Sequence, residues 1–158
     1  MQKIIPFLWF DQQAEEAANF YVSIFKNSRI VNVMRYGEAG HEVHGRPAGS
    51  VMTVEFELNS QAYTALNGGP HFQFNEAISF HVGCDSQDEV DYFLEKLSAG
   101  GREGSCGWLK DKYGVSWQVV PNALKNLLSD PAKAERTMST LLQMKKLDIA
   151  RLEAAVGS

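Results

Sequence analysis

The sequence has little of what marks several classes of protein. Its 158 residues include two cysteines, Cys84 and Cys106, which form no CxxC pair and suit a reducing compartment. The longest apolar run, residues 4–10, contains Pro6 and is too short to span a bilayer. It also lacks the basic start and the small-residue cleavage site of a signal peptide. We therefore expect a cytoplasmic protein without a membrane segment.

The chain also lacks a large excess of charge of either sign. Fifteen Lys and Arg side chains against nineteen Asp and Glu give a net charge of −4, and no long basic run occurs. A dedicated nucleic-acid binder depends on neutralising phosphates, so we expect no nucleic-acid partner. Hydrophobic residues make up 44% of the chain and charged residues 22%, which is typical of a globular protein. A chain of this length buries a core without needing a disulfide or a metal.

The first half of the sequence alternates between strand and helix patterns. The apolar run over 4–10 predicts a strand, and Asp11 is expected to cap the helix that follows. From Ala14 to Phe25, small and apolar side chains recur at three- and four-residue steps, which places them on one helical face. Alternation with a period of two predicts three more strands, over 29–36, 50–58 and 61–67. The glycine-rich stretch over 37–49 is expected to be an exposed loop.

The second half repeats this order of elements. Residues 77–84 predict a strand, Ser86 and Glu89 fit the capping box of a helix, and Gly100 ends that helix. Short strands are expected over 102–106, 108–111 and 115–120. We therefore interpret the chain as one α+β domain, 1–158, that contains two βαβββ modules, 1–70 and 71–121.

Residues 122–158 are predicted to form a helical tail. Asp130 supplies an N-cap and Pro131 a first-turn proline. One helical face is predicted to carry Ala134, Met138, Leu141, Leu142 and Lys145. A second helical segment is expected over 147–156. So apolar a tail is expected to pack on the domain or on a partner subunit.

Several local motifs point to a known family. They read PFLWFD at 6–11, LNGGP at 66–70, CGWLKD at 106–111, YGVSWQVVP at 113–121 and MKKLDI at 144–149. Together they resemble the PhnB-like family, which is often labelled 3-demethylubiquinone-9 3-methyltransferase. That family belongs to the vicinal oxygen chelate superfamily of glyoxalase I, bleomycin-resistance proteins and extradiol dioxygenases, whose tandem βαβββ modules this chain also resembles.

The resemblance implies a fold and an assembly. The paired modules are expected to form a cup-shaped mixed sheet that binds a small molecule on its concave side. In this superfamily modules often pair across subunits, which implies a homodimer. The methyltransferase of the family label is the least favoured activity, because no glycine-rich turn of the GxGxG type follows any predicted strand.

The resemblance also locates where a divalent metal would be bound. Enzymes of the superfamily use His and Glu from the first, fourth, fifth and eighth strands. Here the ligand position of the first strand falls between Ile4 and Pro6, which offers no ligand. The ligand position of the fifth strand falls near Ile78, three residues before His81, which predicts that His81 lies on the side of the strand away from the metal position. The eighth-strand position holds Gln118. We therefore predict no metal and no other cofactor, with His81 a ligand only if the strand register differs.

Gln118 is the leading candidate for a ligand-binding residue, as a hydrogen-bond donor or acceptor. The other candidates are aromatic side chains suited to a flat ligand and one strand carboxylate: Trp108, Trp117, Phe80, Tyr36 and Glu57. The remaining histidines, His41, His44 and His71, are interpreted as loop and linker side chains, and Cys106 as a structural thiol.

Two functions from different classes remain open at this point. The first is a protein that binds a small, partly aromatic molecule without a metal. The alternative is a metal-dependent lyase, isomerase or dioxygenase type of enzyme with a non-standard ligand set that includes His81, His71 or Glu57. Whether the protein is an enzyme is left undecided by the sequence.

Overall fold

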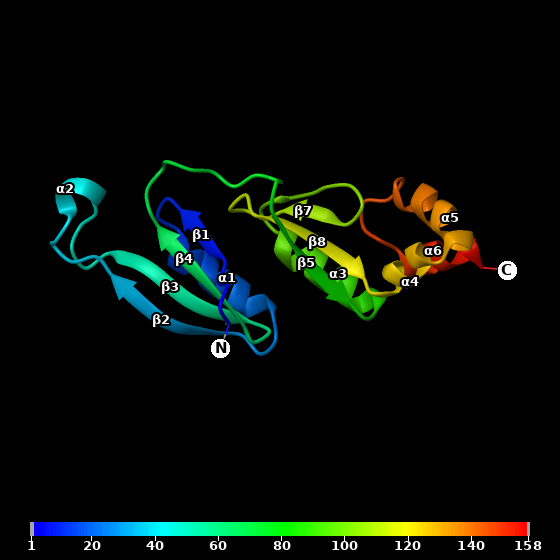
Figure 1. Ribbon diagram of the computed structural model, residues 1–158, viewed down its shortest axis with the longest axis horizontal. Helices are drawn as coiled ribbons and strands as arrows, with labels where there is room; N and C mark the ends of the chain where they lie inside the picture. The colour runs from blue at the N-terminus through cyan, green and yellow to red at the C-terminus, as the bar shows by residue number, and fades with distance from the viewer. Residues whose placement is uncertain (1, 158) are drawn as a thin grey trace. The chain divides into compact units, whose positions relative to one another are not determined.

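The computed structural model describes residues 2–157, which form two four-stranded mixed sheets and six helices (Figure 1). The strands are β1 (Phe7–Phe10), β2 (Arg29–Arg35), β3 (Val51–Leu58), β4 (Gln61–Asn67), β5 (Ser79–Cys84), β6 (Arg102–Glu103), β7 (Trp108–Lys110) and β8 (Ser116–Pro121). The helices are α1 (Ala14–Ile24), α2 (His41–His44), α3 (Gln87–Ser98), α4 (Ala123–Ser129), α5 (Pro131–Leu141) and α6 (Ile149–Val156). The chain divides into two compact units between Gln73 and Phe74.

The first unit is a sheet of order β1-β4-β3-β2 with α1 packed on one face. β1 runs parallel to β4, and the other neighbours are antiparallel. As the sequence predicts, α1 buries a stripe of mostly small side chains, which lets the helix approach the sheet closely: Ala14, Ala17, Ala18, Tyr21 and Ile24. Val54 and Phe56 of β3 lie beneath it, and the alternation of the strand turns Thr53 and Glu55 to the uncovered face.

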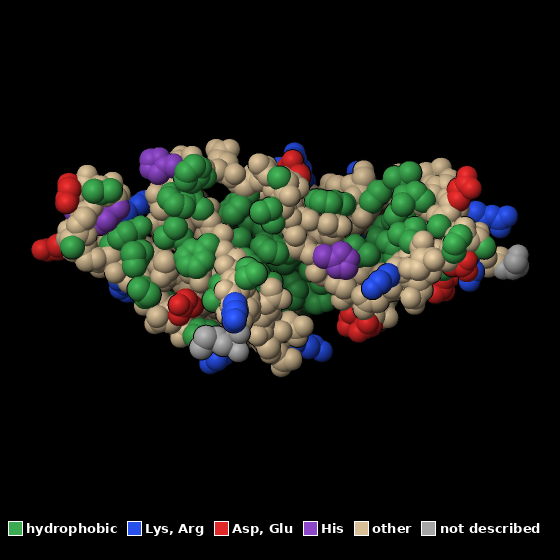
Figure 2. Space-filling view, in the orientation of Figure 1, with side chains coloured by type: hydrophobic (Ala, Val, Ile, Leu, Met, Phe, Trp, Pro, Cys, Tyr) green, Lys and Arg blue, Asp and Glu red, His purple; other side chains and the backbone are tan. Residues whose placement is uncertain are grey.

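The second unit repeats this plan with a sheet of order β5-β8-β7-β6 and α3 packed on one face. The predicted capping box is present in part, because the Glu89 carboxylate binds the N–H of Asp85 and not that of the N-cap residue Ser86. Ser86 Oγ accepts the backbone N–H of Glu89 at 3.2 Å, and the Glu89 carboxylate accepts the backbone N–H of Asp85 at 2.7 Å. Val90, Leu94 and Leu97 are buried on the sheet side of the helix. On the side shown in Figure 2, hydrophobic side chains lie over the strands of each unit.

The helical tail packs on its own unit. Its core consists of Leu124, Leu141, Met144, Leu147 and Leu152. The backbone N–H groups of Cys106 and Gly107 donate to the carbonyls of Met144 and Lys145 at 2.9 and 2.8 Å. The Gln87 side chain donates to the Leu147 carbonyl and accepts the Ile149 backbone N–H. These bonds tie the tail to α3 and to the turn before β7.

The tail differs from its sequence prediction in detail. Met138 and Leu142 were placed on the buried face, but 42% and 64% of their surface is exposed. The helix ends at Leu141, so Leu142 no longer follows the helical spacing on which that prediction rests. Thr137 and Leu141 are the buried side chains of α5. The predicted helical tail over 122–158 does not distinguish a separate helix over Ala123–Ser129.

Three differences concern the first unit. β1 begins at Phe7, and Ile4 before it is 85% exposed. The predicted loop over 37–49 contains the single-turn helix α2. Asp11 is not the N-cap of α1, because Gln13 holds that position and the backbone N–H of Ala14 donates to Asn67 Oδ1 at 2.8 Å. The cap comes from the end of β4 instead of from the preceding residue.

The strands of the second unit are shorter than predicted at both ends of the sheet. The strand expected over 102–106 stops at Glu103, because the backbone N–H groups of Cys106 and Gly107 donate to the tail instead. Cys106 also has a positive φ of 58°, which is incompatible with an extended strand. No helix within residues 2–157 is long and apolar enough to cross a bilayer.

Candidate functional site

One row of side chains crosses the second sheet on the face that α3 does not cover. Gln118 of β8 lies directly opposite Trp108 on β7 and His81 on β5. Residues opposite one another on neighbouring strands project to the same side of a sheet. We call this side the Gln118 face, and its strand residues include Ser79, His81, Trp108, Lys110, Ser116 and Gln118.

Gln118 is half-buried on this face and is held in place by its neighbour. Its Nε2 donates to Ser79 Oγ at 2.9 Å. The Gln118 Oε1 atom has no hydrogen-bond partner among residues 2–157. His81 is exposed, whereas Trp108 is half-buried. The arrangement combines a flat apolar surface with hydrogen-bonding groups, as is typical of sites for small molecules.

The predicted position of His81 is wrong. The three-residue spacing from Ile78 predicts that His81 lies on the side of the strand away from Gln118. In the structure Ile78 precedes β5, and the parallel register pairs His81 with Gln118. Counting from outside the strand misassigned the side chain, because alternation holds only within the strand. No group of three or more His, Cys, Asp or Glu that would hold a metal occurs within residues 2–157.

Two predicted ligand-binding aromatics lie on the other face of the same sheet. Phe80 and Trp117 are register partners, with ring centroids 5.3 Å apart. Trp117 is only 3% exposed, and its indole N–H donates to Asp111 Oδ2 at 2.9 Å. Both side chains project to the side covered by α3. They contribute to the core of the unit and do not line the Gln118 face.

The last two predicted residues belong to the first unit. Tyr36 follows β2, and its hydroxyl donates to the Asn67 carbonyl at 2.6 Å while its ring lies 4.5 Å from the ring of His44. Glu57 accepts from Arg29 Nε at 3.0 Å on the uncovered face of the first sheet. Of the six predicted residues, Gln118 and Trp108 are the two that lie on the Gln118 face, and His81 joins them.

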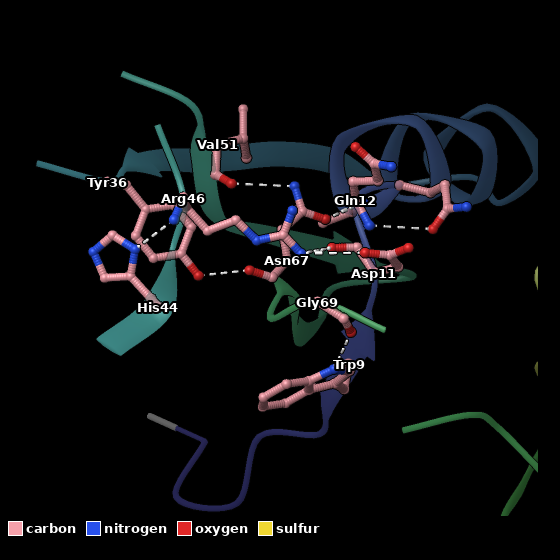
Figure 3. Close-up of polar contacts among 11 residues, drawn as sticks. Trp9, Asp11, Gln12, Tyr36, His44, Arg46, Val51, Asn67 and Gly69 are labelled. Carbon is pink, nitrogen blue, oxygen red and sulfur yellow. Dashed lines mark hydrogen bonds and ion pairs between the residues drawn. The ribbon is translucent and has the colours of Figure 1, made fainter. Parts of the chain in front are cut away.

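A polar network surrounds the end of β4 in the first unit (Figure 3). Besides capping α1, Asn67 donates from Nδ2 to the Val51 carbonyl at 3.1 Å. Arg46 Nη2 donates to the backbone carbonyl and to Oδ1 of Asp11 at 2.8 and 3.2 Å. His44 Nδ1 accepts the backbone N–H of Arg46, so this histidine is tied to its own loop.

A cavity of ≈ 420 Å³ opens beside this network. It is lined by Gln12, Glu15, Glu16, Arg46, Pro47, Ser50, Val51 and Asn67. Arg46 is not among the predicted site residues, because it lies in a glycine-rich stretch without periodicity. The one sequence signal for it is its place in the stretch over 37–49, which is longer than most connections between strands.

The LNGGP motif over 66–70 packs against the Trp9 side chain. The Trp9 indole N–H donates to the Gly69 carbonyl at 2.9 Å, and the ring meets Phe72 edge-on with centroids 4.9 Å apart. A Cβ on Gly68 would lie 2.2 Å from the Trp9 ring. Glycine is therefore required at Gly68 by the close approach of the indole.

Charge on the Gln118 face is confined to one end of it. Lys110 forms an ion pair with Glu76, and this hydrogen bond lowers the pKa of the Glu76 carboxyl from its ordinary value. Arg102, opposite Lys110 on the edge strand, acts on Glu76 in the same direction. The row of Trp108, Gln118 and His81 itself carries no carboxylate, lysine or arginine.

Comparisons with known proteins agree with this fold. A Bacillus cereus protein described as a 3-demethylubiquinone-9 3-methyltransferase, PhnB protein, is 38% identical over 75% of this chain and 99% of its own, with a TM-score of 0.66. A Pseudomonas aeruginosa protein of known structure is 20% identical over 77% of this chain and 98% of its own, with a TM-score of 0.61. No curated protein matches the chain.

The family profile described as 3-demethylubiquinone-9 3-methyltransferase matches residues 2–120. The two βαβββ units and the motifs at 6–11, 66–70 and 106–121 lie within that range or end one residue beyond it. The expected vicinal oxygen chelate fold is therefore confirmed. The chain belongs to the PhnB-like family that carries the 3-demethylubiquinone-9 3-methyltransferase description.

Proposed function

We propose that this PhnB-like protein binds a small, partly aromatic molecule on the Gln118 face without a metal. The observation that carries the proposal is the row of Trp108, Gln118 and His81 across three neighbouring strands. An indole offers a flat surface on which an aromatic ring stacks, and the amide and imidazole groups offer directional hydrogen bonds.

The glycine pairs of the chain argue against the methyltransferase of the family description. A nucleotide-type cofactor needs a glycine-rich turn at which backbone approaches it closely. Gly68 instead lies under the Trp9 ring, and a Cβ on Gly101 would lie 2.1 Å from the Lys110 carbonyl. Both positions are occupied by contacts within the protein, so neither pair offers free backbone to a cofactor.

Replacement of Gln118 tests the proposal directly. We expect members of a panel of small aromatic molecules to raise the melting temperature of the protein and to show saturable binding by calorimetry. In Gln118→Leu the affinity for those molecules should fall about tenfold, because one hydrogen bond is lost and a polar partner group is left unpaired. The matched control is Gln61→Leu, at an exposed position of β4 in the other unit.

Two results would contradict the proposal. If Gln118→Leu bound every molecule as tightly as the parent, Gln118 would not belong to the site. If no aromatic molecule bound the parent protein, the binding function itself would be wrong.

A metal-dependent enzyme is the second candidate, and the position of His81 beside Gln118 favours it. An imidazole and an amide oxygen on one face are ligands that divalent metals accept. The deciding measurement is elemental analysis after dialysis against Mn²⁺, Ni²⁺, Fe²⁺ and Zn²⁺. One equivalent of metal that disappears in His81→Ala would replace our proposal by this one, whereas none under any condition would support metal-free binding.

The proposal retains the expected assembly and compartment. We propose a homodimer, as the family resemblance implies, and a reducing cytoplasmic location, which suits two free cysteines.

A further inference from the structure

The hydrogen-bonding capacity of the Gln118 face is only partly used within the protein. The Gln118 amide gives one N–H to Ser79 Oγ, and this bond fixes the orientation of the amide plane. Within residues 2–157, neither Gln118 Oε1 nor the indole N–H of Trp108 nor the ring nitrogens of His81 has a hydrogen-bond partner. An acceptor of fixed direction therefore lies between an indole and an imidazole.

A buried polar group on this face, the Ser116 hydroxyl, also has no partner in the described part of the chain. Ser116 lies two residues before Gln118 on β8 and is only 2% exposed. Its hydroxyl is among the buried side-chain oxygens without a hydrogen-bond partner in the described part of the chain. Buried polar groups are nearly always paired in folded proteins, so an orphan beside unpaired surface groups indicates a place that a bound molecule or its water completes.

The charged side chains of the face lie away from the row of Trp108, Gln118 and His81. Lys110 and Arg102 lie at the end of the face occupied by Glu76, and the Lys110 ammonium is already paired with that carboxylate. An ionic group of a ligand has no free partner in the row of Trp108, Gln118 and His81. Selectivity in this row has to come from an aromatic surface and uncharged hydrogen bonds.

We infer that the ligand is a flat aromatic molecule with a hydroxyl or ring N–H group, which donates to Gln118 Oε1 while its ring lies against Trp108. This inference rests on the proposed function and adds the chemical class of the ligand. A ligand without a donor would cover Gln118 Oε1 and leave it without either water or a partner. The unpaired oxygen would lower the affinity for such a ligand.

The test compares matched pairs of small probes that differ only in the donor: phenol against anisole, and indole against 1-methylindole. Each probe is titrated into the full chain, and dissociation constants are taken from NMR shifts. The Gln118 side-chain amide signal, identified by its absence in Gln118→Leu, reports the site. We expect the two donor probes to bind at least about fivefold more tightly than their methylated partners, as loss of about 1 kcal/mol implies.

Two variants separate the hydrogen bond from a change in shape. In Gln118→Leu the preference for the donor probe should vanish, whereas Gln118→Glu, which retains an acceptor, should keep it. Ser79→Ala frees the amide to rotate and should reduce the preference without abolishing binding. The melting temperature of each variant shows whether it is folded.

The outcomes distinguish the inference from the proposed function. If both members of each pair bind the parent equally, the donor inference is wrong and aromatic binding stands. If no probe binds, the proposed function itself is wrong. If a preference is found but the Gln118 amide signal does not move, the donor is recognised elsewhere, and the inference is wrong for this face.

Discussion

Asp111 connects the turn between β7 and β8 to the core of the second unit. Its buried carboxylate accepts the backbone N–H groups of Tyr113 and Val115 through Oδ1 and the indole N–H of Trp117 through Oδ2. Three donors lose their acceptor when this carboxylate is removed. We expect Asp111→Ala to lower the free energy of unfolding by about 3 kcal/mol in urea denaturation. The exposed Glu95→Ala of α3 should stay within about 0.5 kcal/mol, and an equally small change for Asp111 would refute its structural role.

The two thiols differ in environment, so their reactivity should differ. Burial, the largest cause, and the nearby carboxylates of Glu89 and Asp85 raise the pKa of the Cys84 thiol to about 12. Only the thiolate reacts, and at pH 8 about one Cys84 in ten thousand would be in that form. We expect one fast-reacting thiol per native chain in a titration with Ellman's reagent. That signal should disappear in Cys106→Ser, and two fast thiols in the parent would contradict this prediction.

Single residues show what a sequence can and cannot predict about this site. Gln118 and Trp108 were predicted as candidates, and the structure places them in one row with His81. The direction of Trp117 and Phe80 was not predictable from residue type, since an indole suits a core as well as a ligand site. The direction of each side chain depends on where the strand begins, and a boundary error of one residue reverses it.

At the scale of elements, α1 depends on a residue 53 positions away from its start. Asn67 accepts the Ala14 N–H and donates to the Val51 carbonyl, so one amide joins α1, β3 and β4. We expect Asn67→Ala to destabilise the protein by about 2 kcal/mol in urea denaturation, because it removes a helix cap and leaves the buried Ala14 N–H and the half-buried Val51 carbonyl unpaired. Gln61→Ala, at the exposed opposite end of β4, is the control. A loss no larger than that of Gln61→Ala would show that α1 does not need this cap.

The same contrast explains which elements were predicted. α3 was predicted correctly at both ends, because its cap and stop signals are local: Ser86 with Glu89, and Gly100. The start of α1 was predicted at Asp11, which instead binds Arg46, because the true cap is remote in sequence. α4 carries no side-chain cap, and with seven residues it is too short to show periodicity. Only tertiary packing of Leu124 reveals it.

At the scale of the whole molecule, the uncovered face of the first sheet exposes apolar side chains beside its charged ones. Phe7 and Met34 lie on it and are 64% and 45% exposed, in line with Trp9 and Leu66. Exposed apolar surface of this kind favours association. We therefore expect sedimentation equilibrium to give twice the 17.6 kDa of one chain, and Phe7→Glu to shift the distribution towards that single-chain mass. A monomeric parent protein at micromolar concentration would contradict the proposed homodimer.

The bonds from Cys106 and Gly107 to the tail carbonyls have a consequence for recombination among relatives. A Cβ on Gly107 would lie 2.6 Å from the Val119 carbonyl and 3.2 Å from the Leu147 side chain, so the turn and the tail are fitted to each other atom by atom. The family profile stops at residue 120, yet the turn it includes is completed by residues 144–147. In a hybrid that took the turn from one relative and the tail from another, the backbone hydrogen bonds and the close packing between the two segments would not match. The turn at Cys106 and Gly107 and the tail over 144–147 therefore have to be exchanged together between relatives.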